Sequence, residues 1–170
     1  LDGIEIQAYG HLMDQFWSPL TNDLDAPYGG SLDNRLRFTF EVLNEIRRRV
    51  GPDFIVGVRY TGDERLEGGF DREDGLEISR RLKESGLVDF LNVVRGHIDT
   101  DAGLTDVIPV QGMPAAPHLD FAGEIRAATD FPPFHAAKIQ DVATARHAVA
   151  AGWGLRADDP RAEAEAERLV

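Results

Sequence analysis

"FIVGVR", residues 54–59, decides the fold, because it is apolar at almost every position and ends in a single charged residue. An antiparallel strand with one face in water alternates apolar and polar residues, whereas a parallel strand covered on both faces reads as a continuous apolar run. The stretch therefore predicts a central strand of a parallel sheet. Parallel strands need long crossover connections, which are usually helices.

The residues before this strand predict one such helix and one further strand. Ser31 is expected to cap a helix that ends at Gly51, because apolar residues recur there every three or four positions. A long polar loop precedes the helix, and "GIEIQ" at 3–7 is predicted as the first strand. Gly29 and Gly30 are expected to turn the loop into the helix cap rather than to bind a phosphate.

The residues after the central strand continue the alternation of strands and helices. A loop of about twenty residues follows the third strand, which is long for a simple connection and indicates a functional segment. The predicted elements are a helix from Asp71 to Gly86, a strand at 88–95, a helix at 118–129, a strand within 131–138 and a helix from Asp141 to Gly152.

Four strand–helix units are half of a (β/α)8 barrel, or most of an open doubly wound sheet. The pattern by itself leaves both architectures open. No G-x-G-x-x-G lies at a strand-to-helix turn, so the dinucleotide-binding form of the open sheet has no specific support. Polar residues gather directly after the predicted strands, where both architectures place their active sites.

Charge and composition narrow the class of partner to a small molecule. The 170 residues carry a formal net charge of −12, which argues against nucleic acid or an anionic membrane. The chain has no cysteine, which excludes disulfides within this stretch and fits the reducing cytoplasm. It shows neither a membrane span nor a signal peptide. Because it opens at "LDGIEI" without an initiator Met, we expect a piece of a longer protein.

Two predicted loops carry side chains suited to proton transfer. Tyr9 and His11 follow the first strand, whereas His97, Asp99 and Asp101 follow the third. Imidazole titrates near neutral pH and an adjacent carboxylate fixes its tautomer, so these groups can form a proton relay. The alternative is that they hydrogen-bond loop backbone. The run "HIDTD" also offers metal-ligand types, but it lacks a second His-rich element, so we expect no metal.

Two cations stand at the ends of predicted strands. Arg59 ends the central strand, where an unpaired guanidinium is costly, so it should meet an anion or an electron-rich ligand atom. The alternative is a salt bridge to Asp63 or Glu64. Lys138, at the end of the fourth strand, suits a phosphate group or solvent.

Four stretches carry a family resemblance: "DGIEIQAYGHLMDQFWSP" at 2–19, "YGGSLDNRLRF" at 28–38, "VGVRYTGDE" at 56–64 and "FHAAKI" at 134–139. They resemble the Old Yellow Enzyme family of FMN-dependent NADH:flavin oxidoreductases. The chain is most similar to the branch with trimethylamine and dimethylamine dehydrogenases, dienoyl-CoA reductases and N-methylproline demethylases. The resemblance covers residues 1–152 and implies a partial (β/α)8 TIM barrel, from about its fourth to its seventh strand. Residues 153–170 are then an atypical polar tail.

The resemblance implies roles for the polar residues after the strands. In the amine dehydrogenase branch, a Tyr, a His and an Asp form a hydrogen-bonded triad over the flavin, and Tyr9, His11 and Asp101 match them as catalytic residues. Gln7 stands where the family commonly has a substrate-binding His. Gln7, Tyr9, His11 and His97 are therefore the expected substrate contacts.

The resemblance also implies three FMN-binding residues. Arg59 aligns with a strand-end Arg near the flavin N1 and C2 oxygen, where a positive charge stabilises the anionic reduced flavin. Lys138 falls where the family has an Arg after a Gly in a phosphate-binding loop, and Ala137 replaces that Gly.

The implied function is oxidation of an N-methylated amine or amino acid, with hydride transfer to FMN. One alternative is an enoate or dienoyl-CoA reductase that takes electrons from NAD(P)H. The other is a catalytically incompetent, truncated barrel module. An iron–sulfur cluster is expected only if a C-terminal region beyond this chain supplies it. Exposed edge strands predict a homo-oligomer.

Overall fold

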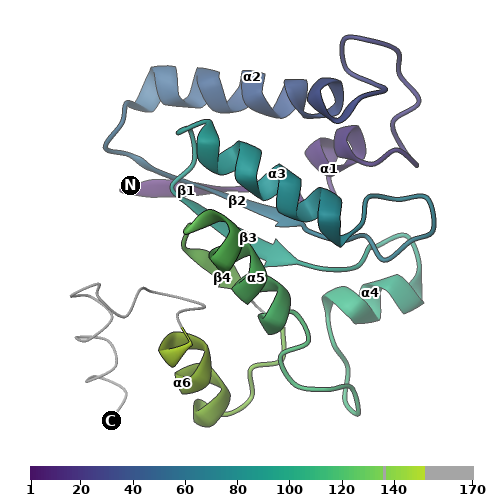
Figure 1. Ribbon diagram of the computed structural model, residues 1–170, viewed down its shortest axis with the longest axis vertical. Helices are drawn as coiled ribbons and strands as arrows, with labels where there is room; N and C mark the ends of the chain where they lie inside the picture. The colour runs from purple at the N-terminus through teal and green to yellow at the C-terminus, as the bar shows by residue number, and fades with distance from the viewer. Residues whose placement is uncertain (136, 152–170) are drawn as a thin grey trace.

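The computed structural model describes residues 1–135 and 137–151, and at its centre lies a parallel sheet with the strand order β1-β2-β3-β4 (Figure 1). The predicted central strand is β2, which pairs with β1 on one side and β3 on the other. The prediction of a parallel sheet is therefore confirmed. The strands are β1 (Gly3–Gln7), β2 (Ile55–Thr61), β3 (Phe90–Val94) and β4 (Pro133–His135).

The helices capped by Ser31, Asp71 and Asp141 begin where the sequence predicts. The side chains of Ser31, Asp71 and Asp141 each accept a backbone N–H in the first turn of the helix that follows. Gly152, the predicted end of the last helix, and residues 153–170 lie outside the described residues. The helices are α1 (Leu12–Trp17), α2 (Leu32–Val50), α3 (Arg72–Glu84), α4 (Asp101–Val107), α5 (Leu119–Thr129) and α6 (Val142–Ala150).

Two segments that the sequence predicts as loops each contain a short helix, so this part of the prediction is wrong. A helix as short as α1 is not stable alone, and burial of Met13 and Trp17 in the core holds it in place. In α4, the side chain of Thr100 caps the helix by accepting the N–H of Gly103, and Val107 is buried. Tertiary packing thus forms both helices where local sequence signals are weak.

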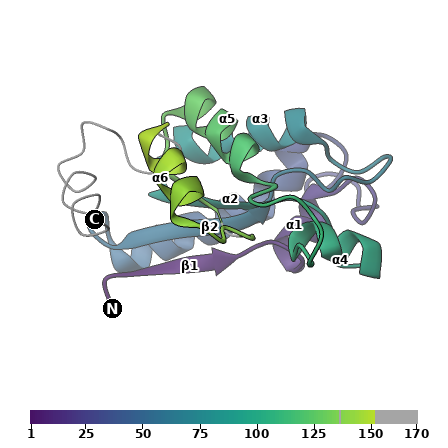
Figure 2. The same ribbon diagram turned by 90° about the horizontal axis from the view of Figure 1, so that it is seen from below.

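The two faces of the sheet differ in what covers them. Val56, Val58 and Tyr60 of β2 are fully buried in the core, on the face where α3 and α5 lie (Figure 2). Ile55 and Phe134 point to the opposite face and remain about half exposed, at 48% and 52%. In a closed barrel this second face lines the interior.

The run "YGGSLDNRLRF" fixes the start of α2. A Cβ on Gly29 would lie 1.7 Å from the backbone oxygen of Leu24, so only glycine fits there. Asn34 Nδ2 donates to the Gly29 oxygen at 2.9 Å, and Arg35 Nε donates to the Trp17 oxygen at 2.6 Å. The run therefore ties the end of α1 to the start of α2, which is the turning role expected for its glycines.

The length and apolar character of the helices also bear on membrane insertion. Within residues 1–135 and 137–151, no helix could cross a lipid bilayer.

Thr39→Val should lower the free energy of unfolding by about 1–3 kcal/mol, the usual cost of leaving a buried donor unpaired. Trp17 Nε1 donates to Thr39 Oγ1 at 2.7 Å, and both side chains are fully buried where α1 meets α2. Urea unfolding of the intact protein measures the loss. Thr39→Ser keeps the hydroxyl and is the control; an equal loss in both variants would assign the effect to packing instead.

Candidate functional site

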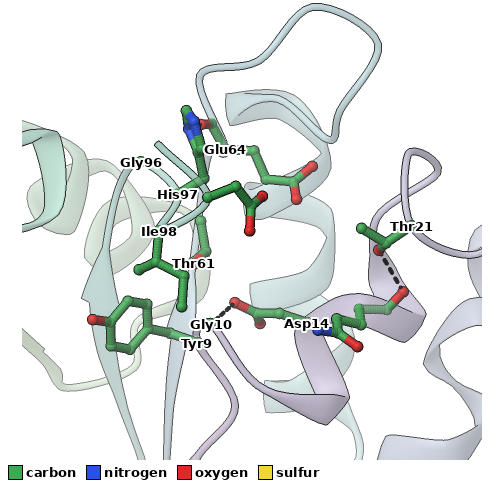
Figure 3. Close-up of a pocket in the computed structure, with 11 residues that line it drawn as sticks. Tyr9, Gly10, Asp14, Thr21, Thr61, Glu64, Gly96, His97 and Ile98 are labelled. Carbon is green, nitrogen blue, oxygen red and sulfur yellow. Dashed lines mark hydrogen bonds between the residues drawn. The ribbon is translucent and has the colours of Figure 1, made fainter. Parts of the chain in front are cut away.

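The loops that follow β1, β2 and β3 meet at the carboxyl ends of the strands and enclose a cavity of about 60 Å³ (Figure 3). This is the position that the sequence predicts for the site. The cavity is acidic, because its lining includes three carboxyl groups and no lysine or arginine among the described residues. Its lining residues are Tyr9, Gly10, Asp14, Gln15, Thr21, Thr61, Glu64, Gly96, His97, Ile98 and Asp99.

The end of β2 holds the loop after β1 in place. The backbone N–H groups of Ala8 and Tyr9 both donate to the carbonyl oxygen of Arg59, at 2.8 and 3.1 Å. Gly10 then turns the chain with a φ of +67°, and a Cβ there would lie 2.8 Å from the Ile98 side chain. The turn therefore depends on glycine and sets Tyr9 at the edge of the cavity.

Asp14 is the most deeply buried carboxyl group of the cavity, with 7% of the residue exposed. Its Oδ2 accepts the N–H of Gly10 at 3.0 Å, and hydrogen bonding from Thr61 offsets part of the effect of burial on its pKa. Burial raises the pKa of this carboxyl from 3.8 to about 7, and the nearby Glu64 adds to the rise. Asp14 can therefore gain or lose a proton near neutral pH.

Glu64 and His97 face the same cavity from the next two loops. Glu64 Oε2 accepts hydrogen bonds from Ser18 Oγ at 2.8 Å and from the Phe70 N–H at 2.9 Å. Burial raises the pKa of Glu64, and the charge of Asp99 raises it further. Both ring nitrogens of His97 are engaged, with the Glu64 carbonyl oxygen at 3.3 Å and Thr100 Oγ1 at 3.1 Å.

Arg59 lacks the salt bridge that the sequence offered as an alternative. Asp63 pairs instead with Arg95 at 2.6 Å, and Glu64 is bonded as described above. The Arg59 guanidinium lies over the Tyr9 ring, 5.2 Å from its centroid, and its buried Nε has no partner in the described part of the chain. A guanidinium without a carboxylate partner at a strand end fits an electron-rich ligand such as the pyrimidine edge of a flavin.

The structure brings together only part of the predicted substrate and catalytic set. Tyr9 and His97 line the cavity, whereas Gln7, His11 and Asp101 do not. His11 is the exposed residue before α1, and Asp101 is the exposed first residue of α4. Across the described ranges, no hydrogen bond joins Tyr9, His11 and Asp101. The triad therefore stays a prediction. Gln7 Nε2 donates to the backbone carbonyl oxygen of Tyr9 at 3.4 Å.

The predicted phosphate-binding residues lie after β4. Ala137 has a φ of +93° and Lys138 a φ of +54°. Ala137 thus adopts backbone angles that favour glycine, the residue that the family resemblance implies at this position. Lys138 Nζ donates to the carbonyl oxygens of Val110, at 2.8 Å, and Met113. An ammonium group carries three protons, so one remains for a phosphate.

Asp14 is the functional candidate that sequence reasoning missed. The sequence predicted a loop at this position, and the burial of Asp14 depends on packing from distant segments that the local sequence does not show. Among residues 1–135 and 137–151, no group of three or more His, Cys, Asp or Glu side chains is placed to hold a metal ion.

Comparisons with known proteins identify what the chain resembles. The model of the NADH:flavin oxidoreductase / NADH oxidase family matches residues 1–103. The chain is 74% identical over 152 residues to a "Probable N-methylproline demethylase" of Rhizobium meliloti (strain 1021), covering 89% of this chain and 22% of that protein. It is 49% identical over 153 residues to a multifunctional alkene reductase/demethylase OYE of Caballeronia cordobensis, with 89% and 22% covered.

Solved structures agree on the fold. A 2-naphthoyl-CoA reductase in complex with 2-naphthoyl-CoA superposes with a TM-score of 0.81 and 27% identity, over 89% of this chain and 23% of that one. Histamine dehydrogenase from Rhizobium sp. 4-9 superposes with a TM-score of 0.78 and 23% identity, over 99% and 25%. The predicted partial (β/α)8 barrel is confirmed, and the chain spans about a fifth of the length of the curated relatives it matches.

Replacing Asp14 by Asn should change how stability depends on pH. The folded-state pKa of about 7 exceeds the ordinary 3.8, so the folded state binds the Asp14 proton more tightly and the parent loses stability as the pH rises between these values. Relative to Asp14→Asn, the parent should therefore lose up to about 4 kcal/mol between pH 4 and pH 8, at 1.36 kcal/mol per pKa unit.

Urea unfolding of the intact protein from pH 4 to pH 8 measures this difference. Asp25→Asn, which removes an exposed carboxyl group, is the matched control. Parallel pH profiles for the parent and Asp14→Asn would show that Asp14 titrates normally.

Proposed function

Because the chain belongs to the NADH:flavin oxidoreductase / NADH oxidase family, we propose that the intact protein is an FMN-dependent oxidoreductase that oxidises an N-methylated amino acid or amine. FMN and a nicotinamide donor are the cofactors that go with this family. The 74% identity to a protein named as a probable N-methylproline demethylase supports the class of substrate.

The observation that carries the proposal is the guanidinium of Arg59, which stands at a strand end over the Tyr9 ring and has no salt bridge within residues 1–135 and 137–151. The backbone oxygen of Arg59 holds the loop with Tyr9. Arg59 would hold the pyrimidine edge of the flavin, while Lys138 and the backbone at Ala137 would meet its phosphate. FMN supplies the two-electron acceptor for the N-methyl C–H bond.

The acidic cavity supports an amine as the substrate. Amines are cations in water, and three carboxyl groups line the space beside Tyr9 with no compensating lysine or arginine among the described lining residues. Such a surface attracts cations and repels anions. Tyr9 and His11 would contact and orient the substrate, Gln7 and His97 would complete its surroundings, and Asp101 would orient His11.

A second candidate is the reduction of an activated alkene with electrons from NAD(P)H. It is favoured by the 49% identity to a relative named as an alkene reductase as well as a demethylase. The acidic cavity and the higher identity to the N-methylproline demethylase, 74% against 49%, make amine oxidation the better supported activity. Localisation in the cytoplasm and a homo-oligomeric state remain predictions.

Substrate-dependent reduction of the flavin tests the function and the roles of Tyr9 and His11. N-methylproline should bleach the flavin of the intact protein under anaerobic conditions, because a hydride leaves its N-methyl group for FMN. Water then hydrolyses the resulting iminium to proline and formaldehyde. Tyr9→Phe and His11→Gln should keep FMN bound and slow this reduction about 10²- to 10⁴-fold, the usual effect of losing an acid–base group. Stopped-flow absorbance measures the rates.

Two outcomes would contradict these assignments. Oxidation of the bound flavin by an enone, with no reduction by N-methylated amino acids, would favour the reductase. Unchanged reduction by His11→Gln would leave His11 as a loop residue without a catalytic role.

Arg59→Gln should weaken FMN binding or lower the flavin midpoint potential, because a positive charge that favours the reduced anion is lost. Fluorescence titration and potentiometry of the intact protein measure the two effects. Arg49→Gln, which removes an exposed arginine from the end of α2, is the matched control. A normal potential and normal affinity in Arg59→Gln would remove Arg59 from the flavin site.

A further inference from the structure

Three polar side chains form one row across the open face of the sheet. Gln7 pairs in register with Arg59, and Arg59 pairs in register with Asn92. Residues paired in this way on parallel strands point to the same face, with the strands about 4.8 Å apart. Arg59 and Asn92 are therefore direct neighbours on the face that a closed barrel buries.

Each of these two neighbours has one buried atom without a hydrogen bond, and the two atoms are complementary. Arg59 Nε carries a donor, whereas Asn92 Oδ1 is an acceptor, and neither has a partner in the described part of the chain. Buried polar groups are nearly always paired, because an unpaired one costs its full desolvation energy. A donor and an acceptor left open on paired residues can satisfy each other through a small side-chain rotation.

The other half of the Asn92 amide is already fixed. Asn92 Nδ2 donates to Glu5 Oε2 at 2.9 Å, although β2 lies between their two strands. Gly57 on β2 pairs with Glu5 in register and has no side chain, and the Phe90 ring occupies the space above it, 2.0 Å from where a Cβ would lie. A carboxylate only accepts hydrogen bonds, so it selects the NH₂ side of the amide. The carbonyl side of Asn92 is left for a donor such as Arg59.

We propose that Asn92 is a positioning residue for Arg59: its Oδ1 accepts the Arg59 Nε–H, and Glu5 holds the amide in the orientation that allows this. With Nε bound inside the sheet, the two NH₂ groups of the guanidinium form a fixed fork toward the ligand at the strand ends. The identity of that ligand as FMN rests on the proposed function, whereas the pairing of Arg59 with Asn92 does not.

A double-mutant cycle on the intact protein tests the pairing. Asn92→Leu should weaken FMN binding about 10- to 100-fold, the effect of losing a hydrogen bond to a charged group. In the Arg59→Gln background the same substitution should have almost no further effect, because its target is gone. The flavin midpoint potential should fall in Asn92→Leu as it does in Arg59→Gln. Asn44→Leu, at an exposed position of α2, is the control and should change neither quantity.

A second cycle, on Glu5 and Asn92, tests whether Asn92 acts through its hydrogen bonds or only through packing. Glu5→Leu removes the acceptor that orients the Asn92 amide, so it should weaken FMN binding in the parent but have almost no effect in Asn92→Leu, where the amide is absent. Equal effects of Asn92→Leu in both Arg59 backgrounds, or equal effects of Glu5→Leu with and without Asn92, would overturn the proposal.

The cycle also distinguishes failure of the proposal from failure of the proposed function. If the intact protein binds no FMN, the proposed function fails, and the same four proteins are compared by urea unfolding. Non-additive losses of stability for Arg59→Gln and Asn92→Leu would then support the pairing, and additive losses would overturn it.

Discussion

The outer face of β2 is the constraint on which the rest of the structure depends. Val56, Val58 and Tyr60 are fully buried there in the core, so the alternate residues of β2, Gly57 and Arg59, must face the other side. The carbonyl oxygen of Arg59 then binds the loop after β1. Burial of β2 therefore fixes the face to which the Arg59 side chain points and the path of the loop after β1.

The order of strands and helices could be predicted because it follows from short-range rules. Continuous apolar runs mark buried parallel strands, and Ser31, Asp71 and Asp141 mark helix starts through bonds within one turn. The family resemblance then selected the barrel over the open sheet, which periodicity left undecided. The helices α1 and α4 were missed because contacts from distant parts of the chain stabilise them.

The sequence predicted where the candidate site lies, but it did not predict all the residues that line it. Strand ends meet at one edge of a parallel sheet, so Tyr9 and His97 lie together as expected. Which carboxyl groups join them depends on loop packing: Asp14 is buried in the cavity, whereas Asp101 is exposed on α4. The sequence spacing of His11 and Asp101 carries no information on the distance between them in space.

At the candidate site, the guanidinium of Arg59 and the carboxyl groups of the cavity do not neutralise one another. Arg59 has no salt bridge in the described part of the chain, although the carboxyl groups of Asp14 and Glu64 lie in neighbouring loops. Burial raises the pKa values of both acids, because it disfavours their charged forms. Under the proposed function, this separation would keep the cation for the electron-rich acceptor and the carboxyl groups for the amine donor. A salt bridge between Arg59 and Glu64 would occupy the groups that both proposed contacts need.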